Sequence, residues 1–393
     1  MKYMIKLEEA LTIIQRYTRV ENSERTGLVT AMNRVLAEDI FSDMDMPPFN
    51  KSAVDGYAFR LVDFDETLDI IESVPAGSSP LKTVSHGQCT KIMTGAPVPA
   101  GADCVVMIED TEISNNRIRI LQKPGKSNIC LLGEDVRKGD LVIEKGTVLK
   151  PQHISVLASS GHVMPEVYKQ PQITIIVTGN ELVEPDTVPP GSKIRNSNGY
   201  QLISQGTSSG CKTTYYGIIK DDIRDLKIAV ESAFRLSDIL VITGGASKGD
   251  FDLIPHIMEQ LGFNVHITEV AIQPGKPFNF STRNNLICFG LSGNPVSSFV
   301  QFELLVKPFL NAKSGIIKKP VSLKLPLSKS VSRKKTERAF FFPVAISADA
   351  IVSPLEFHGS AHSTALVNAD GIASVPPGIK QLKKGENVDV RPF

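Results

Sequence analysis

The sequence predicts a multidomain α/β protein, with a parallel α/β domain in its second half and β-rich units before and after it. The chain has 393 residues, more than one hydrophobic core usually serves. From residue 172 to about 312, strand-like runs alternate with helical stretches, which is typical of a parallel sheet. Over 43–147 and after 320, short β-branched runs alternate instead with Gly and Pro turns, which predicts two smaller β units.

The first half of the chain is expected to begin with an amphipathic helix. Leu7, Leu11 and Ile14 recur at helical spacing within residues 5–19. The β-rich unit that follows has predicted strands at Ala102–Ile108, Arg117–Leu121 and Leu141–Ile143. A second helix is predicted over Pro151–Ser160, because proline suits the first helical position and Gly161 can end the helix.

The second half is expected to alternate regularly and then return to strands. Predicted strands cover 173–179, 213–220, 239–245, 265–272 and 285–293. Predicted helices lie near 197–208, 222–236, 252–261 and 295–312. After the Lys-rich stretch 313–320, the runs FFFPVAIS and ENVDVRPF predict a terminal β domain.

Composition narrows the classes of function. Lys and Arg total 43 against 42 Asp and Glu, a net charge of +1, so the chain lacks the positive charge of a nucleic-acid-binding protein. The five cysteines form no CxxC pair, which argues against a thiolate zinc site and a disulfide framework. The N-terminus lacks the apolar stretch of a signal peptide, and no long apolar run predicts a membrane span. A cytoplasmic protein with no nucleic-acid or membrane partner is expected.

Three strand ends carry glycine turns that suit ligand binding. They are Thr178-Gly179, Thr243–Gly245 and Gly290–Gly293, and ligands of open α/β sheets bind beyond the carboxyl ends of the strands. Any one of these turns alone is explained by ordinary strand-to-helix geometry, but three in one sheet favour a binding site. No GxGxxG motif or P-loop is present, so classical dinucleotide binding and P-loop hydrolysis are disfavoured.

Several acids beside turn residues could hold a hard cation such as Mg²⁺, which prefers oxygen ligands. These acids are Asp55, Asp135, Glu181, Asp221 and Asp252. For each one alone, a solvated turn or a helix cap is the more ordinary explanation. His358 and His362 flank a polar glycine-containing loop, which leaves a binding role open for them.

Seven motifs occur in the order seen in one family. They are NKSAVDGYA (50–58), KIMTGAPVPAGAD (91–103), GEDV (133–136), VTGNEL (177–182), TGGASKGDFD (243–252), PGKP (274–277) and GLSGNPVSS (290–298). On these motifs, which span nearly the whole chain, the sequence resembles the molybdopterin molybdenumtransferases, that is MoeA and the E domain of gephyrin.

The resemblance implies an architecture and an activity. It implies an N-terminal helical and extended domain (1–45 and 138–171), an inserted β-rich domain (46–137), a MogA-like molybdopterin-binding α/β domain (172–314) and a C-terminal β-barrel (315–393). The implied reaction joins molybdate to adenylylated molybdopterin and releases AMP, with Mg²⁺ as cofactor. Members are homodimers with the active site between subunits, and residues 1–150 look too segmented to form a self-contained core, which also favours a dimer.

The resemblance also assigns roles to residues. The catalytic acids would be Asp55, Glu181 and Asp252, the last two also binding the metal. The substrate-binding residues, with Thr178 and Gly179 added from the strand-end turn, would be Thr94, Asp135, Asp221, Gly244, Gly245, Ser247, Gly249, Lys276, Pro295, Ser297 and Ser360. The upstream adenylyltransferase and apo-molybdoenzymes are further expected partners.

The sequence departs from the family at the expected oxyanion subsite. Gln273 stands before PGKP where many members have Lys, and Lys248 could restore that charge if it points inward. Ser292 replaces a proline, and Asn180 stands where members often have Asp. Two alternatives stay open: the same chemistry with tungstate, and a scaffold protein that kept the fold, although the intact acids Asp55, Glu181 and Asp252 favour the enzyme.

Overall fold

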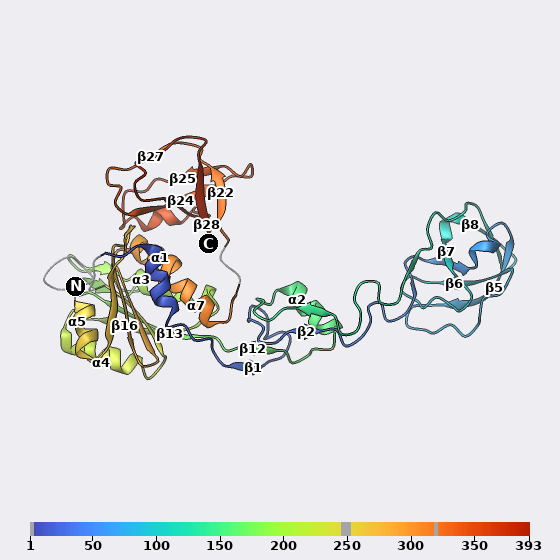
Figure 1. Ribbon diagram of the computed structural model, residues 1–393, viewed down its shortest axis with the longest axis horizontal. Coiled ribbons are helices and arrows are strands. Elements are labelled where there is room, and N and C mark those ends of the chain that lie inside the picture. The colour runs from blue at the N-terminus through green and yellow to red at the C-terminus, as the bar shows by residue number, and fades with distance from the viewer. Residues whose placement is uncertain (1–3, 245–252, 318–320) are drawn as a thin grey trace.

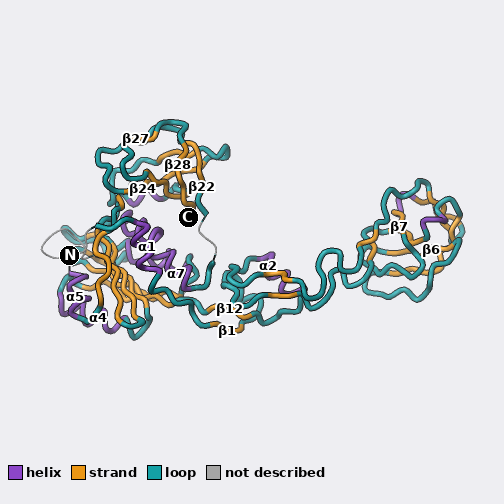
Figure 2. The backbone as a smooth tube through the Cα atoms, in the orientation of Figure 1, coloured by secondary structure: helices purple, strands orange, loops and turns teal. Residues whose placement is uncertain are grey.

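The computed structural model describes residues 4–244, 253–317 and 321–393 (Figure 1). The molecule is elongated. An α/β unit and a C-terminal β unit lie at one end, a second β unit lies at the other end, and a narrow middle unit joins them. Figure 2 shows that most of the helices gather in the α/β unit, whereas the distal unit is built almost wholly of strands and loops.

The distal unit is a six-stranded sheet with its own core. The strand order is β7-β4-β6-β5-β9-β8. The bounds are β4 (Gly56–Phe59), β5 (Thr67–Val74), β6 (Gln88–Ile92), β7 (Cys104–Met107), β8 (Thr111–Ser114) and β9 (Arg117–Ile120). Tyr57, Phe59 and Leu68 are buried among apolar neighbours. The expectation that residues 1–150 form no self-contained core is therefore wrong, because runs that are short in sequence pair into one sheet.

The middle unit is drawn from two separate stretches of chain. β1 (Ser23–Arg25) pairs with β12 (Glu166–Tyr168), and β2 (Ile40–Phe41) pairs with β11 (Leu141–Ile143). Together with α2 (Pro151–Ser159), these strands enclose a small core whose members include Leu36, Leu149 and Leu157. β3 (Lys51–Ser52) and β10 (Ile129–Cys130) pair where the chain passes into the distal unit.

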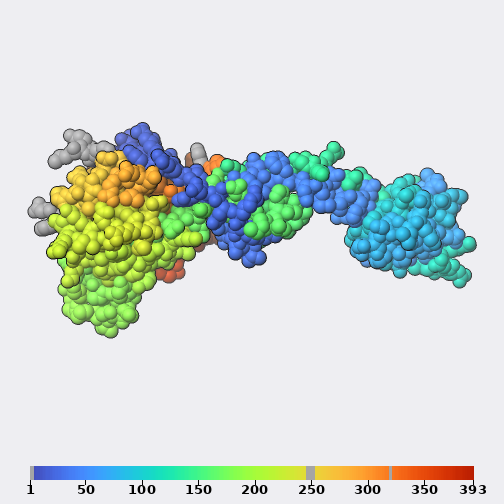
Figure 3. Space-filling view, turned by 90° about the horizontal axis from the view of Figure 1, so that it is seen from below, coloured from blue at the N-terminus to red at the C-terminus, as the bar shows by residue number. Residues whose placement is uncertain are grey.

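The first helix, α1 (Leu7–Gln15), packs on the α/β unit. Ala10 and Ile14 are fully buried in the same cluster as Phe302 of the α/β unit. In Figure 3, the blue N-terminal residues lie against the yellow and orange residues of the α/β unit. The predicted grouping of 1–45 as one domain therefore does not describe α1. An amphipathic pattern shows which face of a helix is buried but not which partner buries it.

The α/β unit holds a six-stranded sheet of order β16-β13-β17-β21-β20-β18. Its strands are β13 (Gln172–Thr178), β16 (Lys212–Ile219), β17 (Ile239–Thr243), β18 (Asn264–Glu269), β20 (Pro277–Arg283) and β21 (Leu286–Leu291). The five predicted strands all run in one direction, as expected. The additional strand β20 was not predicted; it runs antiparallel to both of its neighbours and leads into β21 through a tight turn in which Asn284 takes a φ of 57°.

Helices cover both faces of this sheet, where the sequence predicts them. They are α3 (Asn198–Ser208), α4 (Ile223–Ala233), α5 (Leu253–Gln260) and α6 (Pro295–Gln301). α6 continues through one π-helical stretch (Phe302–Val306) into α7 (Lys307–Lys313). Asp222 begins α4 by accepting hydrogen bonds from the backbone N–H groups of Arg224 (2.8 Å) and Asp225 (3.0 Å).

The C-terminal unit is a closed β-barrel, as expected. Its strands are β22 (Leu323–Pro326), β24 (Ala339–Ile346), β25 (Val352–Pro354), β26 (Gly371–Val375) and β28 (Asn387–Pro392), with β23 (Val331–Ser332) and β27 (Gln381–Leu382) as a separate pair. The path β24-β26-β28-β22 closes through a bridge from Leu327 to Val352 in β25, which pairs with β24. β19 (Ile272–Gln273) of the α/β segment adds to β24, so the two units share one sheet edge.

Candidate functional site

The carboxyl ends of β13, β17 and β21 open into a cleft of about 1170 Å³. The register places Val177 beside Thr243 and Thr243 beside Leu291, so the three glycine turns meet at one edge of the sheet. The opposite wall comes from the barrel, through Arg338 and the loop that carries Phe357 and Ser360. The shared edge at β19 and β24 holds these two walls together.

The predicted site residues fall into three sets. Those that line the cleft are Thr178, Glu181, Asp221, Gly244, Lys276, Pro295, Ser297 and Ser360. Gly179 lies beside it, where an added Cβ would come within 2.9 Å of the Glu181 carboxylate oxygens. Gly245, Ser247, Gly249 and Asp252, together with Lys248, lie outside the described residues. The remaining three, Asp55, Thr94 and Asp135, lie in the other half of the molecule.

The floor of the cleft requires glycine at position 244. Gly244 has a φ of +101°, and an added Cβ would lie 2.1 Å from the carbonyl oxygen of Thr178. Next to it, the Asn198 amide donates to Thr243 Oγ1 (3.1 Å) and to the Gly293 carbonyl (2.8 Å). Asn198 Oδ1 and Thr178 Oγ1 are buried with no hydrogen-bond partner among the described residues. Buried polar atoms are nearly always hydrogen-bonded, so a partner from a water or a ligand is expected at each of these oxygens.

One buried amide links two edges of the cleft. Gln301 is fully buried; its Oε1 accepts from the Ser292 N–H (2.8 Å), and its Nε2 donates to the carbonyls of Gly275 (2.9 Å) and Pro277 (2.5 Å). These contacts fix the backbone on both sides of Lys276. The Lys276 ammonium in turn pairs with Glu269 at 2.7 Å, a carboxylate that the sequence analysis did not single out.

Two cationic residues of the cleft were not among the site residues predicted from the sequence. Arg195 lines it from β15 (Ile194–Arg195), and Arg338 lines it from the barrel, where Nη1 donates to the Ile272 carbonyl (3.1 Å). The signals were a basic pair, Lys193 and Arg195, just before the asparagines of α3, and the basic run that precedes β24. Arg338 therefore bonds the residue that precedes Gln273, the position at which the expected cation is absent.

A second cluster lies at the base of the distal unit. The Thr94 backbone N–H (2.7 Å) and hydroxyl (2.8 Å) both donate to Asp55 Oδ1, and these two bonds hold the pKa of Asp55 below its usual value. Asp135 follows the neighbouring β10 segment, and its N–H donates to Met46 (3.0 Å). All three side chains are exposed, and no described residue of the distal unit lines the cleft. Figure 1 shows the distal unit at the opposite end of the molecule from the α/β unit.

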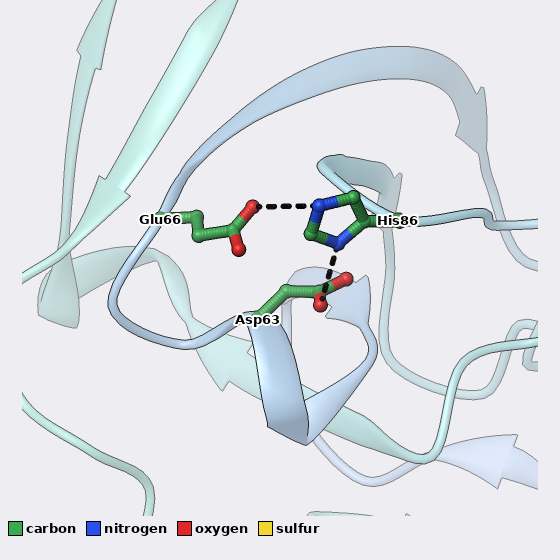
Figure 4. Close-up of side chains that lie close together, drawn as sticks. All are labelled: Asp63, Glu66 and His86. Atoms are coloured by element: carbon green, nitrogen blue, oxygen red, sulfur yellow. Dashed lines mark hydrogen bonds and ion pairs between the residues drawn. The ribbon is translucent and has the colours of Figure 1, made fainter.

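His86 forms an ion-paired cluster with Asp63 and Glu66 in the distal unit, outside the cleft (Figure 4). His86 Nδ1 lies 3.0 Å from Asp63 Oδ1, and His86 Nε2 lies 3.6 Å from Glu66 Oε2. Arg60 approaches the other Asp63 oxygen at 3.8 Å. Because cations already match these carboxylates, the cluster is explained as an ion-pair network in the distal unit. His358 and His362 stack with ring centroids 5.0 Å apart, and neither lines the cleft.

Within the described parts of the chain, every helix is too short or too polar to cross a membrane. The same residues show no disulfide, and all five cysteines are free thiols.

Three family models together match almost the whole chain. "MoeA N-terminal region (domain I and II)" matches residues 5–161, "Probable molybdopterin binding domain" matches 174–312, and "MoeA C-terminal region (domain IV)" matches 324–393.

Curated relatives and a solved structure agree with these models. The "Molybdopterin molybdenumtransferase" of Staphylococcus aureus is 34% identical over 98% of this chain and 95% of its own length. That of Bacillus subtilis is 33% identical over 98% and 93%. The crystal structure of the molybdopterin biosynthesis MoeA protein from Pyrococcus horikoshii OT3 is 30% identical, covers all of both chains and superposes with a TM-score of 0.86. The chain therefore belongs to the MoeA family of molybdopterin molybdenumtransferases, proteins of molybdenum cofactor biosynthesis.

Proposed function

We propose that this transferase inserts molybdenum from molybdate into adenylylated molybdopterin and releases AMP. The observation that carries the proposal is the cleft, where a glycine floor, two unpartnered buried oxygens and cationic edges meet beyond the strand ends. The substrate is a pterin with a bridged diphosphate, so it needs hydrogen-bond donors and acceptors on its pterin side and positive charge on its phosphate side. The names of the whole-length relatives support the same reaction.

Molybdate would bind at the cationic edge of the cleft. Lys276 is held there by the Gln301 contacts to its neighbours, and Arg338 stands close to Gln273. Because Glu269 pairs with Lys276 at 2.7 Å, an incoming dianion competes with that carboxylate for the ammonium. Arg338 then supplies positive charge that Gln273 does not. Tungstate has nearly the same size and charge, so the same edge would accept it.

Mg²⁺ fits the acidic side of the same cleft. Glu181 and Asp221 both line it, and exposed carboxylate oxygens are the ligands that Mg²⁺ prefers. Asp252, the third expected acid, lies outside the described residues. When bound, the ion would neutralise the charge that builds on the leaving phosphate. Glu181 and Asp221 would hold it there.

Asp55 would complete the site from a second copy of the chain. Thr94 lowers the pKa of the Asp55 carboxyl group, and its Oδ2 has no partner among the described residues, so it can act on a bound substrate. It lies in the half of the molecule that contributes nothing to the cleft of its own chain. A homodimer in which the distal half of one subunit reaches the cleft of the other would bring Asp55, Thr94 and Asp135 to the ligand.

The proposed setting is the cytoplasm. Five free cysteines, four of them buried, suit a reducing compartment. The upstream adenylyltransferase would supply the adenylylated pterin, and apo-molybdoenzymes would receive the product; both are the expected protein partners.

The test is incubation of the purified protein with adenylylated molybdopterin, Mg²⁺ and molybdate, with AMP release and cofactor formation followed together. The proposal predicts AMP release that requires all three additions, and a parallel reaction with tungstate measures the preference between the oxyanions. Tight pterin binding without AMP release under any of these conditions would contradict the proposal and favour the scaffold alternative.

A further inference from the structure

We propose that Tyr215 is a positioning residue for the acidic side of the cleft. Its hydroxyl joins Glu184 and Asn196, the residues that directly follow the two strands of a small sheet carrying Glu181. Tyr215 itself lies on β16, the edge strand of the main sheet. This hydroxyl therefore adds a side-chain link between the main sheet and the segment that presents Glu181, beside the backbone bond from Gly179 N–H to the Ile219 carbonyl of β16 (3.2 Å). The role in catalysis rests on the function proposed above.

The small sheet consists of β14 (Leu182–Val183) and β15 (Ile194–Arg195), which pair in parallel. The Ile194 N–H donates to the Glu181 carbonyl (2.8 Å), and the Asn196 N–H donates to the Val183 carbonyl (2.8 Å). The backbone of Glu181 is therefore bonded to β15. Any movement of the small sheet relative to the main sheet would carry Glu181 with it.

The contacts of Tyr215 form a directed chain of hydrogen bonds. Asn196 Nδ2 donates to the Tyr215 hydroxyl (2.7 Å), which donates to Glu184 Oε1 (2.6 Å). Tyr200 of α3 adds a longer bond to Glu184 Oε2 (3.2 Å). The other side of the Asn196 amide accepts from the Gly199 N–H at the start of α3 (3.0 Å). The carboxyl end of the small sheet is thus tied both to β16 and to α3.

Burial and charge fix which group donates and which accepts in this series of hydrogen bonds. Asn196 is 2% exposed, so its amide has no solvent to replace the hydroxyl as an acceptor. Burial, together with the hydrogen bond to Glu184, raises the pKa of Tyr215 above its usual value, so the hydroxyl keeps its proton and remains the donor. A hydrogen bond from a neutral hydroxyl to a carboxylate is stronger than one between neutral groups. Loss of the hydroxyl would leave Asn196 without its acceptor and Glu184 without its stronger donor.

Glu181 depends on this support because its own side chain has little. In the described part of the chain, the Glu181 carboxylate makes no hydrogen bond or ion pair, although it lines the cleft. Its position is therefore set by its backbone and by the close approach to Gly179. A catalytic or metal-binding group must be held to within a fraction of an ångström by its surroundings, and here those surroundings lead back to Tyr215.

The test compares Tyr215→Phe with Tyr216→Phe in the intact protein. Tyr216 is the next residue on β16 and packs on the other face of the sheet, in the cluster that includes Ala229 and Leu240. Its hydroxyl has no hydrogen bond to any described residue, so it is a matched control. Two quantities are measured: amide hydrogen exchange over residues 181–196, and the dependence of AMP release on Mg²⁺ and on the pterin.

We expect Tyr215→Phe to raise exchange at the small-sheet amides by about tenfold, as loss of a bond to a charged group implies. We also expect turnover to fall by a similar factor and half-saturation with Mg²⁺ to rise, while half-saturation with the pterin stays constant. Tyr216→Phe should match the wild type in each measurement. A merely structural effect would lower the midpoint of thermal unfolding without separating the Mg²⁺ and pterin dependences.

Unchanged exchange, unchanged turnover, or the same change in both variants would overturn the role of Tyr215. These outcomes differ from a failure of the proposed function. A wild-type protein that released no AMP would refute that function and, with it, the part of Tyr215 in it. If the wild type releases AMP and Tyr215→Phe matches it in both turnover and exchange, only the positioning role of Tyr215 is refuted.

Discussion

Thr94 lowers the pKa of Asp55, and this predicts a shift in the pH dependence of the reaction. Its backbone N–H and hydroxyl lower the pKa of Asp55 below 3.8, so the carboxylate stays ionised to lower pH than an ordinary Asp. Thr94→Val removes the hydroxyl bond and keeps the backbone bond. We expect the acid limb of the pH profile of AMP release to move to higher pH, with the plateau rate little changed.

The control for this experiment is Asp55→Asn. It should abolish AMP release and leave pterin binding nearly intact, because the cleft that binds the pterin contains no described residue of the distal unit. Wild-type turnover in Asp55→Asn, or an acid limb of the pH profile that Thr94→Val leaves unchanged, would show that this carboxylate does not act in the reaction.

Lys276 and Glu269 predict opposite effects on the oxyanion. Lys276→Ala should raise the molybdate concentration for half-maximal rate by roughly tenfold to a hundredfold, since a charge-assisted contact is worth about 1.5–3 kcal/mol. Glu269→Gln should lower that concentration, because it removes the carboxylate that pairs with the Lys276 ammonium at 2.7 Å. Gln273→Lys should lower it as well. If these variants changed the affinity for the pterin and left the dependence on molybdate constant, the assignment of the molybdate subsite to Lys276 would be wrong.

His86 predicts a pH dependence of stability that has nothing to do with the cleft. The hydrogen bond to Asp63, and then the charge of Glu66, raise the pKa of His86 above 6.5. A raised histidine pKa contributes stability that is complete below 6.5 and is lost as pH rises through the folded-state value. The difference in unfolding midpoint between the wild type and His86→Gln should therefore shrink as pH rises above neutrality. A difference that stays constant with pH would contradict this ion pairing.

The sequence could indicate which residues carry charge at the cleft, but not how they are paired. Lys276 stands out because PGKP is a family motif, whereas its partner Glu269 belongs to no motif and meets it only through the fold. Arg338 was missed for the same reason: it enters the cleft from another domain. Such contacts join residues that are distant in sequence, so no local pattern reports them.

Helix α1 predicts where the N-terminal residues contribute stability. Ile14 is fully buried against the α/β unit, so Ile14→Ala should cost about 2–5 kcal/mol. The exposed neighbour Gln15 is the matched control, and Gln15→Ala should change the free energy of unfolding by less than about 0.5 kcal/mol. Hydrogen exchange should show the loss of protection in β18 and α7. If protection were lost only in the middle unit, the packing of α1 on the α/β unit would be contradicted.

Strands and helices of the α/β unit were largely predictable, because alternation and turn residues are local signals. β17 and β21 read as apolar runs bounded by glycine, and both are buried as such runs predict. β20 was not predicted although Phe278 and Phe280 alternate with polar residues as in a strand; the sequence did not show that the polar residues between them are buried as well. The small sheet of β14 and β15 was missed because two residues per strand leave no period to detect.

The elongated shape separates two groups of site residues that the family motifs list together. The order of the motifs identified the site residues but not the distances between them in the fold. The distal unit has a core of its own and lies far from the cleft. The dimer is therefore favoured by the geometry of the site: Asp55 and the cleft of one chain lie at opposite ends. A monomer in analytical ultracentrifugation at micromolar concentration, with full activity, would contradict this account.

Subunit complementation tests most directly whether the site is shared between two chains. Asp55→Asn keeps an intact cleft, and Glu181→Gln keeps an intact Asp55, so each variant alone should be inactive. Co-expressed and randomly assorted, the two should recover about a quarter of the wild-type AMP release, because half of the dimers then hold one complete site of two. Complementation to that level is the predicted result. A mixture as inactive as its components, in dimers shown to have exchanged subunits, would contradict a site completed by the partner chain.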